Sequence, residues 1–423
     1  MLPTAQNICG GHARLTERVP ELDGLRGIAI ALVLYFHCFV QAVQGPLREA
    51  INPLVLPGRS GWTGVDLFFV LSGFLIGGIL LDARSSTNYF RVFYTRRFFR
   101  IVPCYVALLV TYYGLCTLGT LGKLQQFQWQ DAWGMPWYVS ALFLQNFWIA
   151  MQNTWQPGAL SILWSLSVEE QFYLTLPWLV RFQDQKRLLH LAAEGVVLAV
   201  CLRLLMFKLF PWNSKIWYVM MPCRADALLL GFVGAILWRD EGWRARFADN
   251  RGLHRALLVV LAAGIPFFTW EHDNPFGRPL VSVGLTWIAF FYFLLLMYAL
   301  VHKQGSVARL LRWRWLRWLG GIAYGVYLFH RLFAASLAAF VWHRNRDLGI
   351  FRPLELLLQI LMIAVLLIFC RLLFIYFERP LLQRGHKVSY DFPPADGTSI
   401  ATPGDYQERS QLESGCAREG HRC

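Results

Sequence analysis

Arg26 and His37 lie in one apolar segment, residues 25–43, with ten residues between them. The segment is long and apolar enough to cross a membrane as a helix. An ionisable side chain is costly inside such a helix, so both residues are candidate functional groups with partners nearby. Eleven steps of helical rise separate them by roughly 16 Å along the axis. We therefore expect Arg26 near one membrane face and His37 well into the other half.

His37 is the candidate general base, because an imidazole titrates near the operating pH and a neighbouring carboxylate would stabilise its charged form. Glu169 and Asp66 are the carboxylates predicted at the same depth and are the candidate catalytic partners. Two structural alternatives stand beside this interpretation. His37 can be a packing residue bonded to a backbone carbonyl, and Asp66 can cap its helix or pair with Arg224.

The arginines at the opposite membrane face suggest an anion site. Arg97 and Arg100 are three residues apart and share a helix face. Together with Arg26 they could hold the phosphates of a nucleotide-like co-substrate, since a guanidinium binds phosphate through two parallel hydrogen bonds. The alternative for each arginine is ordinary anchoring to lipid head groups.

Further polar and aromatic side chains are predicted to reach the same cavity as His37. Trp164, Arg224, Asp226 and Tyr327 are the candidate acceptor-binding residues. Arg224 and Asp226 can instead pair with other buried charges and be purely structural. His330, one turn after Tyr327, can line the cavity or make a structural hydrogen bond.

The composition indicates which elements position these residues. The chain has 423 residues, of which 56% are hydrophobic and only 16% are charged. A soluble protein of this length would carry more charge, so the sequence predicts an all-α, polytopic transmembrane bundle. The net charge of +14 would suggest nucleic acid in a soluble protein, but here membrane topology explains it. The nine cysteines show no metal-binding spacing, and we expect no metal.

The distribution of basic residues gives an orientation. Eighteen Lys and Arg residues lie in alternate loops on one side, against eight in the opposite loops, which places the first set and both termini in the cytoplasm. The expected spanning helices are 25–43, 62–81, 101–119, 164–180, 190–210, 218–238, 256–270, 280–301, 319–341 and 353–377.

Three segments fall outside this pattern. Residues 135–151 are apolar, but an extra span there would reverse the charge rule, so we expect a re-entrant or interfacial element on the outer face. Residues 1–20 are expected to be a cytoplasmic segment and 21–381 the membrane domain. Residues 382–423 are polar without periodicity and are predicted to be a disordered cytoplasmic tail.

The motifs together resemble acyltransferase family 3, a family of integral membrane proteins that modify exported sugars and related acceptors. No single motif is specific, but their combination and order are. The matching stretches are residues 21–30 with the Arg26–His37 spacing, 64–75, 97–103, 164–173, 224–228, 323–330 and 378–380.

The resemblance implies transfer of an acyl group, acetyl first, from a coenzyme A thioester to a hydroxyl, with no permanently bound cofactor. It implies His37 as the catalytic histidine, Arg26, Arg97 and Arg100 as the motif arginines, and Glu169 as the motif glutamate. The expected location is the cytoplasmic membrane of a bacterium. The expected acceptor is a surface polysaccharide or its lipid-linked precursor, with a macrolide-type small molecule as the second choice.

A different class of function is also compatible with the sequence. Intramembrane His, Asp, Glu and Arg residues are found in proton-coupled secondary transporters. Against this alternative, the chain shows no internal repeat and carries a cluster of arginines at the inner face. A transporter would move its substrate without consuming a thioester.

Overall fold

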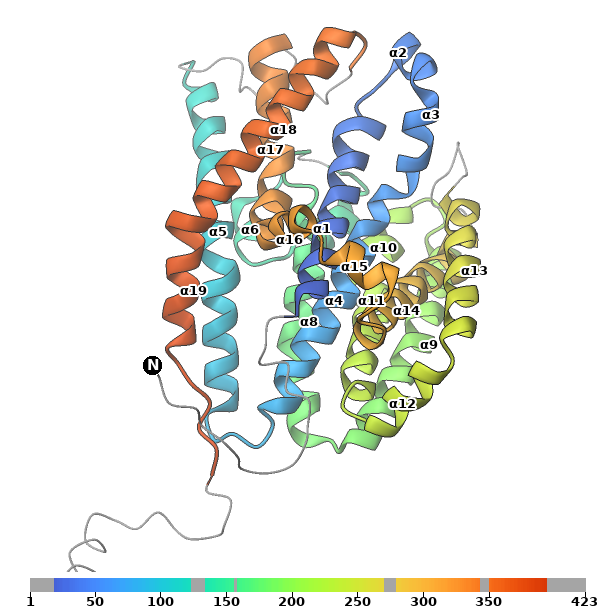
Figure 1. Ribbon diagram of the computed structural model, residues 1–423. Helices are drawn as coiled ribbons and strands as arrows, with labels where there is room; N and C mark the ends of the chain where they lie inside the picture. Colours follow the sequence, from blue (N-terminus) through green and yellow to red (C-terminus); the bar gives the residue numbers. More distant parts are fainter. Residues whose placement is uncertain (1–18, 123–133, 156–157, 270–278, 343–349, 394–423) are drawn as a thin grey trace, which may run out of the picture.

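The computed structural model describes residues 19–122, 134–155, 158–269, 279–342 and 350–393. These residues are almost entirely helical, and an isolated bridge between Val43 and Ile350 is the β-type pairing found among them. The helices form a single bundle (Figure 1) in which α5 and α13 stand at opposite edges. The predicted polytopic helical architecture is confirmed.

Nine helical stretches in the described residues are long and apolar enough to cross a membrane. They correspond to nine of the ten expected spans. They are α1 (Pro20–Tyr35) with η1 (Phe36–Val40), η2 (Leu56–Thr63) with α4 (Gly64–Asp82), α5 (Tyr89–Thr120), α9 (Gln185–Leu209), α10 (Ser214–Val219) with α11 (Met221–Leu237), α13 (Arg251–Thr269), η4 (Leu280–Gly284) with α14 (Leu285–Val301), α17 (Ala323–Trp342), and α18 (Pro353–Leu373) with η5 (Phe374–Glu378) and α19 (Arg379–His386).

The tenth expected span is the helix α8, Leu163–Phe182. It packs against α4 and α11 inside the bundle, although it is not among the nine apolar stretches. Its polar run, residues 169–171, lowers its mean hydropathy. Glu169, Glu170 and Gln171 are each at least half-buried, so α8 carries polar groups into the interior of the protein.

The apolar segment 135–151 does not form a continuous helix. It contains two short helices, α6 (Trp137–Ala141) and α7 (Gln145–Gln152), separated by Phe143 with a φ of 56°. A positive φ is unfavourable for a bulky side chain and interrupts helical hydrogen bonding. The segment is thus too short in each part to span a membrane, in agreement with the expected re-entrant or interfacial element.

The helices α1, α4 and α11 form the centre of the bundle. In the most apolar stretch of η2–α4, 72% of residues are buried in the protein, against none in that of α13. Backbones of α4 and α11 approach closely, because a side chain at Gly73 would strike the carbonyl of Leu228 and one at Gly231 would strike that of Val70. Such contacts between small residues are a common way to join helices in a membrane.

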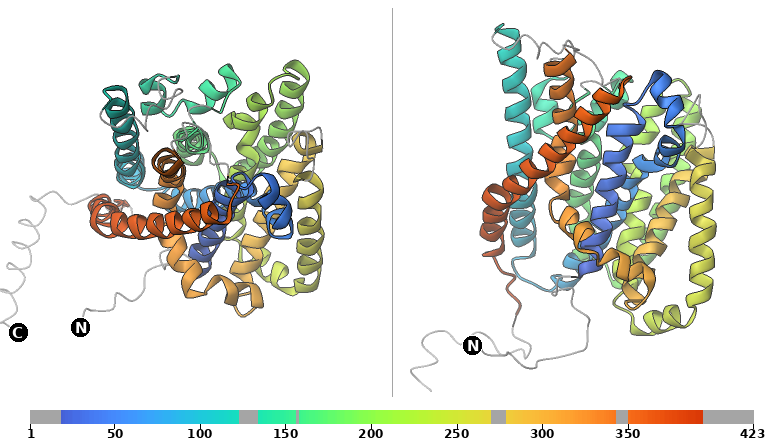
Figure 2. Two further views of the ribbon diagram at one scale, coloured as in Figure 1. Left: turned by 90° about the horizontal axis from the view of Figure 1, so that it is seen from above. Right: turned by 45° about the horizontal axis from the view of Figure 1, so that its top comes forward.

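The remaining short helices lie between the spans. They are α2 (Gly45–Ala50), α3 (Asn52–Val55), α12 (Glu241–Asp249), α15 (Ser306–Leu311) and α16 (Arg314–Gly321). The expected span 319–341 is divided, because α16 ends at Gly321 and α17 begins at Ala323 in a new direction. Both views of Figure 2 show α18 running obliquely along one side of the bundle to α19.

The last described residues pack against the start of α5. The Asn88 amide donates to the Ser389 carbonyl at 3.0 Å, and Arg96 donates to the Val388 carbonyl at 2.8 Å. Helical and hydrogen-bonded structure therefore continues past residue 381, where the tail was expected to begin, and the division into membrane domain and tail stays a prediction. The rest of the expected tail, and the expected N-terminal segment up to residue 18, lie outside the described residues.

Candidate active site

His37 sits near the end of the first spanning helix, where α1 changes into the wider π-helical turn Phe36–Val40. Such turns inside an α-helix frequently mark functional sites. The Nδ1 atom of His37 is 3.2 Å from Nε2 of His330 on α17, and the two ring centroids are 5.1 Å apart. The Nδ1 atom of His330 is in turn 2.8 Å from the Tyr327 carbonyl oxygen.

The expected carboxylate partners of His37 have other contacts. Asp66 accepts a hydrogen bond from Arg224 at 2.6 Å. Glu169 accepts hydrogen bonds from the hydroxyls of Ser72 and Tyr173, each at 3.0 Å. Within the described part of the chain, His37 is hydrogen-bonded to a histidine and to neither carboxylate. The orienting partner expected from the sequence was therefore wrong, and His330 takes that position.

Asp66 and Arg224 form a buried ion pair between α4 and α11, as the structural alternative predicted. The Arg224 guanidinium lies over the rings of Phe69, Trp164 and Tyr218, at 5.7, 5.9 and 5.2 Å from their centroids. In the described residues, Oδ2 of Asp66 and Nε and Nη1 of Arg224 are buried without a hydrogen-bond partner. Unpaired buried polar atoms are costly, so a polar ligand beside this pair would be stabilised.

Asp226 belongs to a second buried ion pair, with Arg203 of α9 at 2.9 Å. The same carboxylate oxygen accepts a hydrogen bond from Thr286 at 2.6 Å, and Arg203 also donates to the Val281 carbonyl. Asp226 is thus engaged in tying α9, α11 and α14 together. Sequence analysis did not single out Arg203, although an arginine inside an apolar segment was the available signal.

Tyr327 joins α17 to α8 beside the two histidines. Its hydroxyl is 2.5 Å from the Ser165 hydroxyl and donates to the Ile162 carbonyl at 2.9 Å. Its ring lies 5.9 Å from that of His330. Tyr327 is therefore close to the histidine pair. Trp164, which precedes Ser165 on α8, is close to the Asp66–Arg224 pair.

The three predicted arginines lie toward the opposite end of α1 and along α5. Arg26 donates to Asp23 at 2.9 Å, and Arg100 forms an ion pair with the buried Glu378. Arg26 is close enough to Arg97 and Arg100 for their charges to repel one another. The structure therefore brings Arg26 close to Arg97 and Arg100, which lie 71 or more positions later in the sequence.

Arg97 differs from its two neighbours. Its guanidinium lies 6.0 Å from the ring centroids of both Phe93 and Tyr173, and no ion pair to it is found among the described residues. Its Nε is buried and has no hydrogen-bond partner there. Arg97 is thus the member of the cluster with a charge available for an anionic ligand.

A network of buried polar groups holds the α6–α7 segment against the spans. Ser167 of α8 donates to the Gln145 side chain at 2.6 Å, and the Tyr105 hydroxyl of α5 donates to the Ser140 carbonyl at 2.6 Å. The Gln145 amide also contacts the Tyr105 hydroxyl. This network was not predicted, because it depends on pairings between segments that are distant in sequence.

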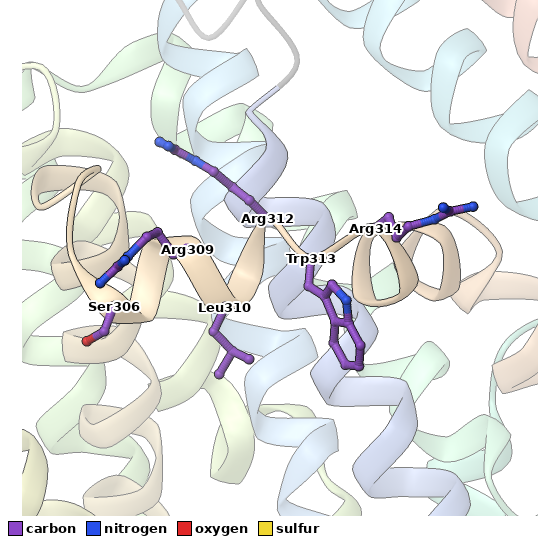
Figure 3. Close-up of a pocket in the computed structure, with 6 residues that line it drawn as sticks. All are labelled: Ser306, Arg309, Leu310, Arg312, Trp313 and Arg314. Atoms are coloured by element: carbon purple, nitrogen blue, oxygen red, sulfur yellow. The ribbon is translucent and has the colours of Figure 1, made fainter.

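A second group of arginines lies around the turn between α15 and α16. They border an open hollow of about 540 Å³, lined by Ser306, Arg309, Leu310, Arg312, Trp313 and Arg314 (Figure 3). The side chains of Arg312 and Arg314 point in different directions, and Arg312 is paired with Glu21. Leu310 and Trp313 project together to one side and are exposed. This arrangement matches anchoring at a membrane interface rather than a converging anion site.

Comparison with known proteins places these features in context. A family model described as an acyltransferase domain matches residues 19–376. A putative peptidoglycan O-acetyltransferase of Bacillus subtilis is 30% identical over 339 residues, which cover 74% of this chain and 48% of that protein. A peptidoglycan O-acetyltransferase of Listeria monocytogenes is 27% identical over 328 residues, covering 74% and 49%.

An O-acetyltransferase of Staphylococcus aureus is 24% identical over 406 residues, covering 91% of this chain and 60% of that protein. The chain thus spans about half the length of the curated relatives it matches. No solved structure matches it.

Proposed function

Because this chain belongs to the acyltransferase family whose domain matches residues 19–376, we propose that it transfers an acyl group, acetyl first, from a coenzyme A thioester to a hydroxyl of a surface glycan. Peptidoglycan is the first acceptor to test, since two bacterial relatives are named as peptidoglycan O-acetyltransferases. The observation that carries the proposal is a pair of histidines, half-buried His37 and fully buried His330, at one end of a spanning helix whose other end lies in a cluster of arginines.

In this proposal His37 is the general base. It takes the proton of the acceptor hydroxyl while the hydroxyl oxygen attacks the thioester carbonyl carbon. The carbon–sulfur bond then breaks, and the sulfur of coenzyme A takes the proton from His37. The contact with the fully buried His330 supports this role, because it fixes one ring nitrogen of His37 while the half-buried ring can still meet a substrate.

Arg26, Arg97 and Arg100 bind the phosphates of the donor at the cytoplasmic end. Arg97 is the main contact, since Arg26 and Arg100 share their charges with Asp23 and Glu378. The donor's arm then extends along the interior of the bundle toward His37. The roughly 16 Å of helix between Arg26 and His37 sets the length that this arm must cover.

The acceptor binds from the outer face, near the Asp66–Arg224 pair and the aromatic side chains around it. Aromatic rings and charged groups in one place are suited to the mixed apolar and hydroxyl-bearing faces of a sugar. Glu169 lies between the two ends, hydrogen-bonded to Ser72 and Tyr173, and lines the path of the donor's arm. The bacterial relatives and the distribution of arginines support a cytoplasmic membrane with both termini inside.

Release of free coenzyme A by the purified full chain in detergent tests the proposal. The mixture contains acetyl-coenzyme A with peptidoglycan fragments or other glycans as acceptors. We expect release that depends on acceptor, and a fall of at least about 100-fold in His37→Ala, the range in which a general base contributes. His190→Gln is the matched control, since His190 is exposed on α9 and bonded to the Lys186 carbonyl.

Two results would contradict the proposal. Full activity in His37→Ala with normal membrane insertion would remove the general-base role. Movement of a glycan across vesicle membranes with no release of coenzyme A for any acceptor would favour the transporter alternative.

A further inference from the structure

The contact between His37 and His330 allows the proton on each ring to be assigned. Nδ1 of His330 is 2.8 Å from the Tyr327 carbonyl oxygen, and a carbonyl oxygen can only accept a hydrogen bond. Nδ1 of His330 therefore carries a proton. A neutral imidazole has one N–H group, so Nε2 of His330 holds a lone pair and is an acceptor.

The assignment then passes to His37. Its Nδ1 is 3.2 Å from Nε2 of His330, so Nδ1 of His37 must be the donor. A doubly protonated His330 would reverse the argument, but its ring is fully buried and Arg331 repels a second positive charge there.

We propose that His330 is a positioning residue that holds His37 in the tautomer with Nδ1 protonated and Nε2 free as the base. The inference rests on the proposed function, because a free Nε2 matters only if His37 accepts a proton from the acceptor hydroxyl. After that transfer, the His37 imidazolium still donates from Nδ1 to the lone pair of His330. A neutral ring thus takes the place in which a carboxylate was expected.

This arrangement has a chemical consequence. A carboxylate partner would stabilise the imidazolium through its full charge, whereas the His330 ring offers a neutral acceptor only. The His37 imidazolium is then a stronger acid than it would be beside a carboxylate, which favours return of its proton to the leaving sulfur. Orientation of the ring, rather than charge, is what His330 contributes.

The test uses the full chain in detergent with isotope-labelled histidine. Nuclear magnetic resonance distinguishes a protonated from an unprotonated ring nitrogen, and the His37 signals are identified by their loss in His37→Phe. Two variants separate the roles of the side chain at 330. His330→Phe keeps a ring of similar size without an acceptor, and His330→Gln supplies an amide oxygen at about the reach of Nε2. His190→Gln is again the control.

In the wild type we expect the unprotonated nitrogen of His37 to be Nε2. His330→Phe should lower kcat by about 10- to 100-fold, as loss of a group that orients a functional histidine does, with the KM for acetyl-coenzyme A unchanged. The population of the Nδ1-protonated form should fall in the same variant. His330→Gln should restore much of both quantities.

An unprotonated Nδ1 in wild-type His37 overturns the assignment, whatever the activity. Unchanged kcat and unchanged tautomer in His330→Phe overturn the positioning role. Failure of the proposed function is a separate outcome, since it removes acceptor-dependent release of coenzyme A from the wild type itself. The tautomer is measured in the same sample without substrates, so the two failures are distinguishable.

Discussion

At the residue scale, the Asp66–Arg224 pair is the contact whose role is most open to a decisive test. The two side chains are 1% and 0% exposed, and three of their polar atoms have no hydrogen-bond partner in the described residues. A purely structural pair would usually have its hydrogen bonds satisfied within the protein. The unsatisfied atoms therefore favour a role in binding the acceptor.

Removing one or both charges of this pair separates the two roles. Asp66→Asn should lower the free energy of unfolding by about 3–5 kcal/mol, because it leaves the Arg224 charge buried and unpaired. The double variant Asp66→Asn with Arg224→Met should recover most of that stability but not the KM for acceptor. Thermal unfolding and coenzyme A release measure the two quantities.

The matched control is Asp82→Asn, which breaks an ion pair with Arg239 at the other, more exposed end of α4. Its cost should be smaller than that of Asp66→Asn, because the Asp82 side chain is 35% exposed and Arg239 keeps hydrogen bonds to the carbonyls of Ala235 and Gly78. A double variant with the wild-type KM for acceptor would show that the Asp66–Arg224 pair serves stability alone.

The residue scale also shows where sequence reasoning stopped. The type and spacing of Arg26 and His37 predicted functional residues with polar partners nearby, and the structure places Asp23 beside Arg26 and His330 beside His37. Their functional roles stay predictions. The partner of His37 was wrong because His330 is 293 positions away and only the fold places it there. Glu169 lies on the helix that the sequence predicted. The rotation of α8 about its axis decides that Glu169, and not the adjacent Glu170, accepts from the Ser72 and Tyr173 hydroxyls.

At the element scale, the packing of α4 on α11 determines the distance between the groups proposed to bind the acceptor. Asp66 lies on α4 and Arg224 on α11. About two turns further along each helix, Gly73 and Gly231 let the two backbones touch. A methyl group at Gly73 would clash with the backbone carbonyl of Leu228, which cannot rotate away as a flexible side chain could.

Gly73→Ala should therefore destabilise the protein by about 1–3 kcal/mol, the usual cost of an overpacked interior. Gly114→Ala, inside α5 near its C-terminal end, is the control, because no atom lies within 4 Å of a side chain built there. That variant should be neutral or slightly stabilising, since alanine favours helix. Equal melting temperatures for the two variants would show that the α4–α11 contact relaxes freely.

The helices themselves were largely predictable, and the exceptions have physical reasons. Long apolar stretches predict spanning helices, because a helix that crosses the bilayer needs about 20 apolar residues. The predicted start of the third span at residue 101 was too late, since α5 begins at Tyr89 and carries its arginines within the helix. The division of the span near residue 319 depends on Gly320 packing against the Asp23 carbonyl of α1, which sequence alone does not reveal.

At the scale of the whole molecule, the arginine cluster lies toward the start of α1 and His37 lies near its far end. In the proposed orientation these two ends face opposite sides of the membrane. The donor and the acceptor should therefore enter from different sides.

Proteoliposomes with one orientation of the protein test this arrangement. Acetyl-coenzyme A does not cross the bilayer. Coenzyme A should therefore be released only when the donor is on the membrane side of the connection 239–255, which contains α12, and the acceptor is on the other side. The side is identified by protease access to that connection. Reaction with both substrates supplied on the same side, and none when they are separated, would contradict the arrangement.

The polar helix α8 has a consequence for how the chain is made. A charged residue at the centre of a helix opposes insertion from the translocon by about 2.5–3.5 kcal/mol, and the acidic residues Glu169 and Glu170 within α8 oppose it in the same way. Its hydrogen-bonding partner Ser72 is on α4, and its neighbours Tyr105 and Gln145 also precede it in the chain. By the time α8 leaves the ribosome, the partners of Glu169 on α4 and of Ser167 on α7 have already been synthesised, whereas Tyr327, which contacts Ser165, follows later. The order of the helices in the chain therefore allows the earlier helices to bind polar groups of α8 as this helix enters the membrane.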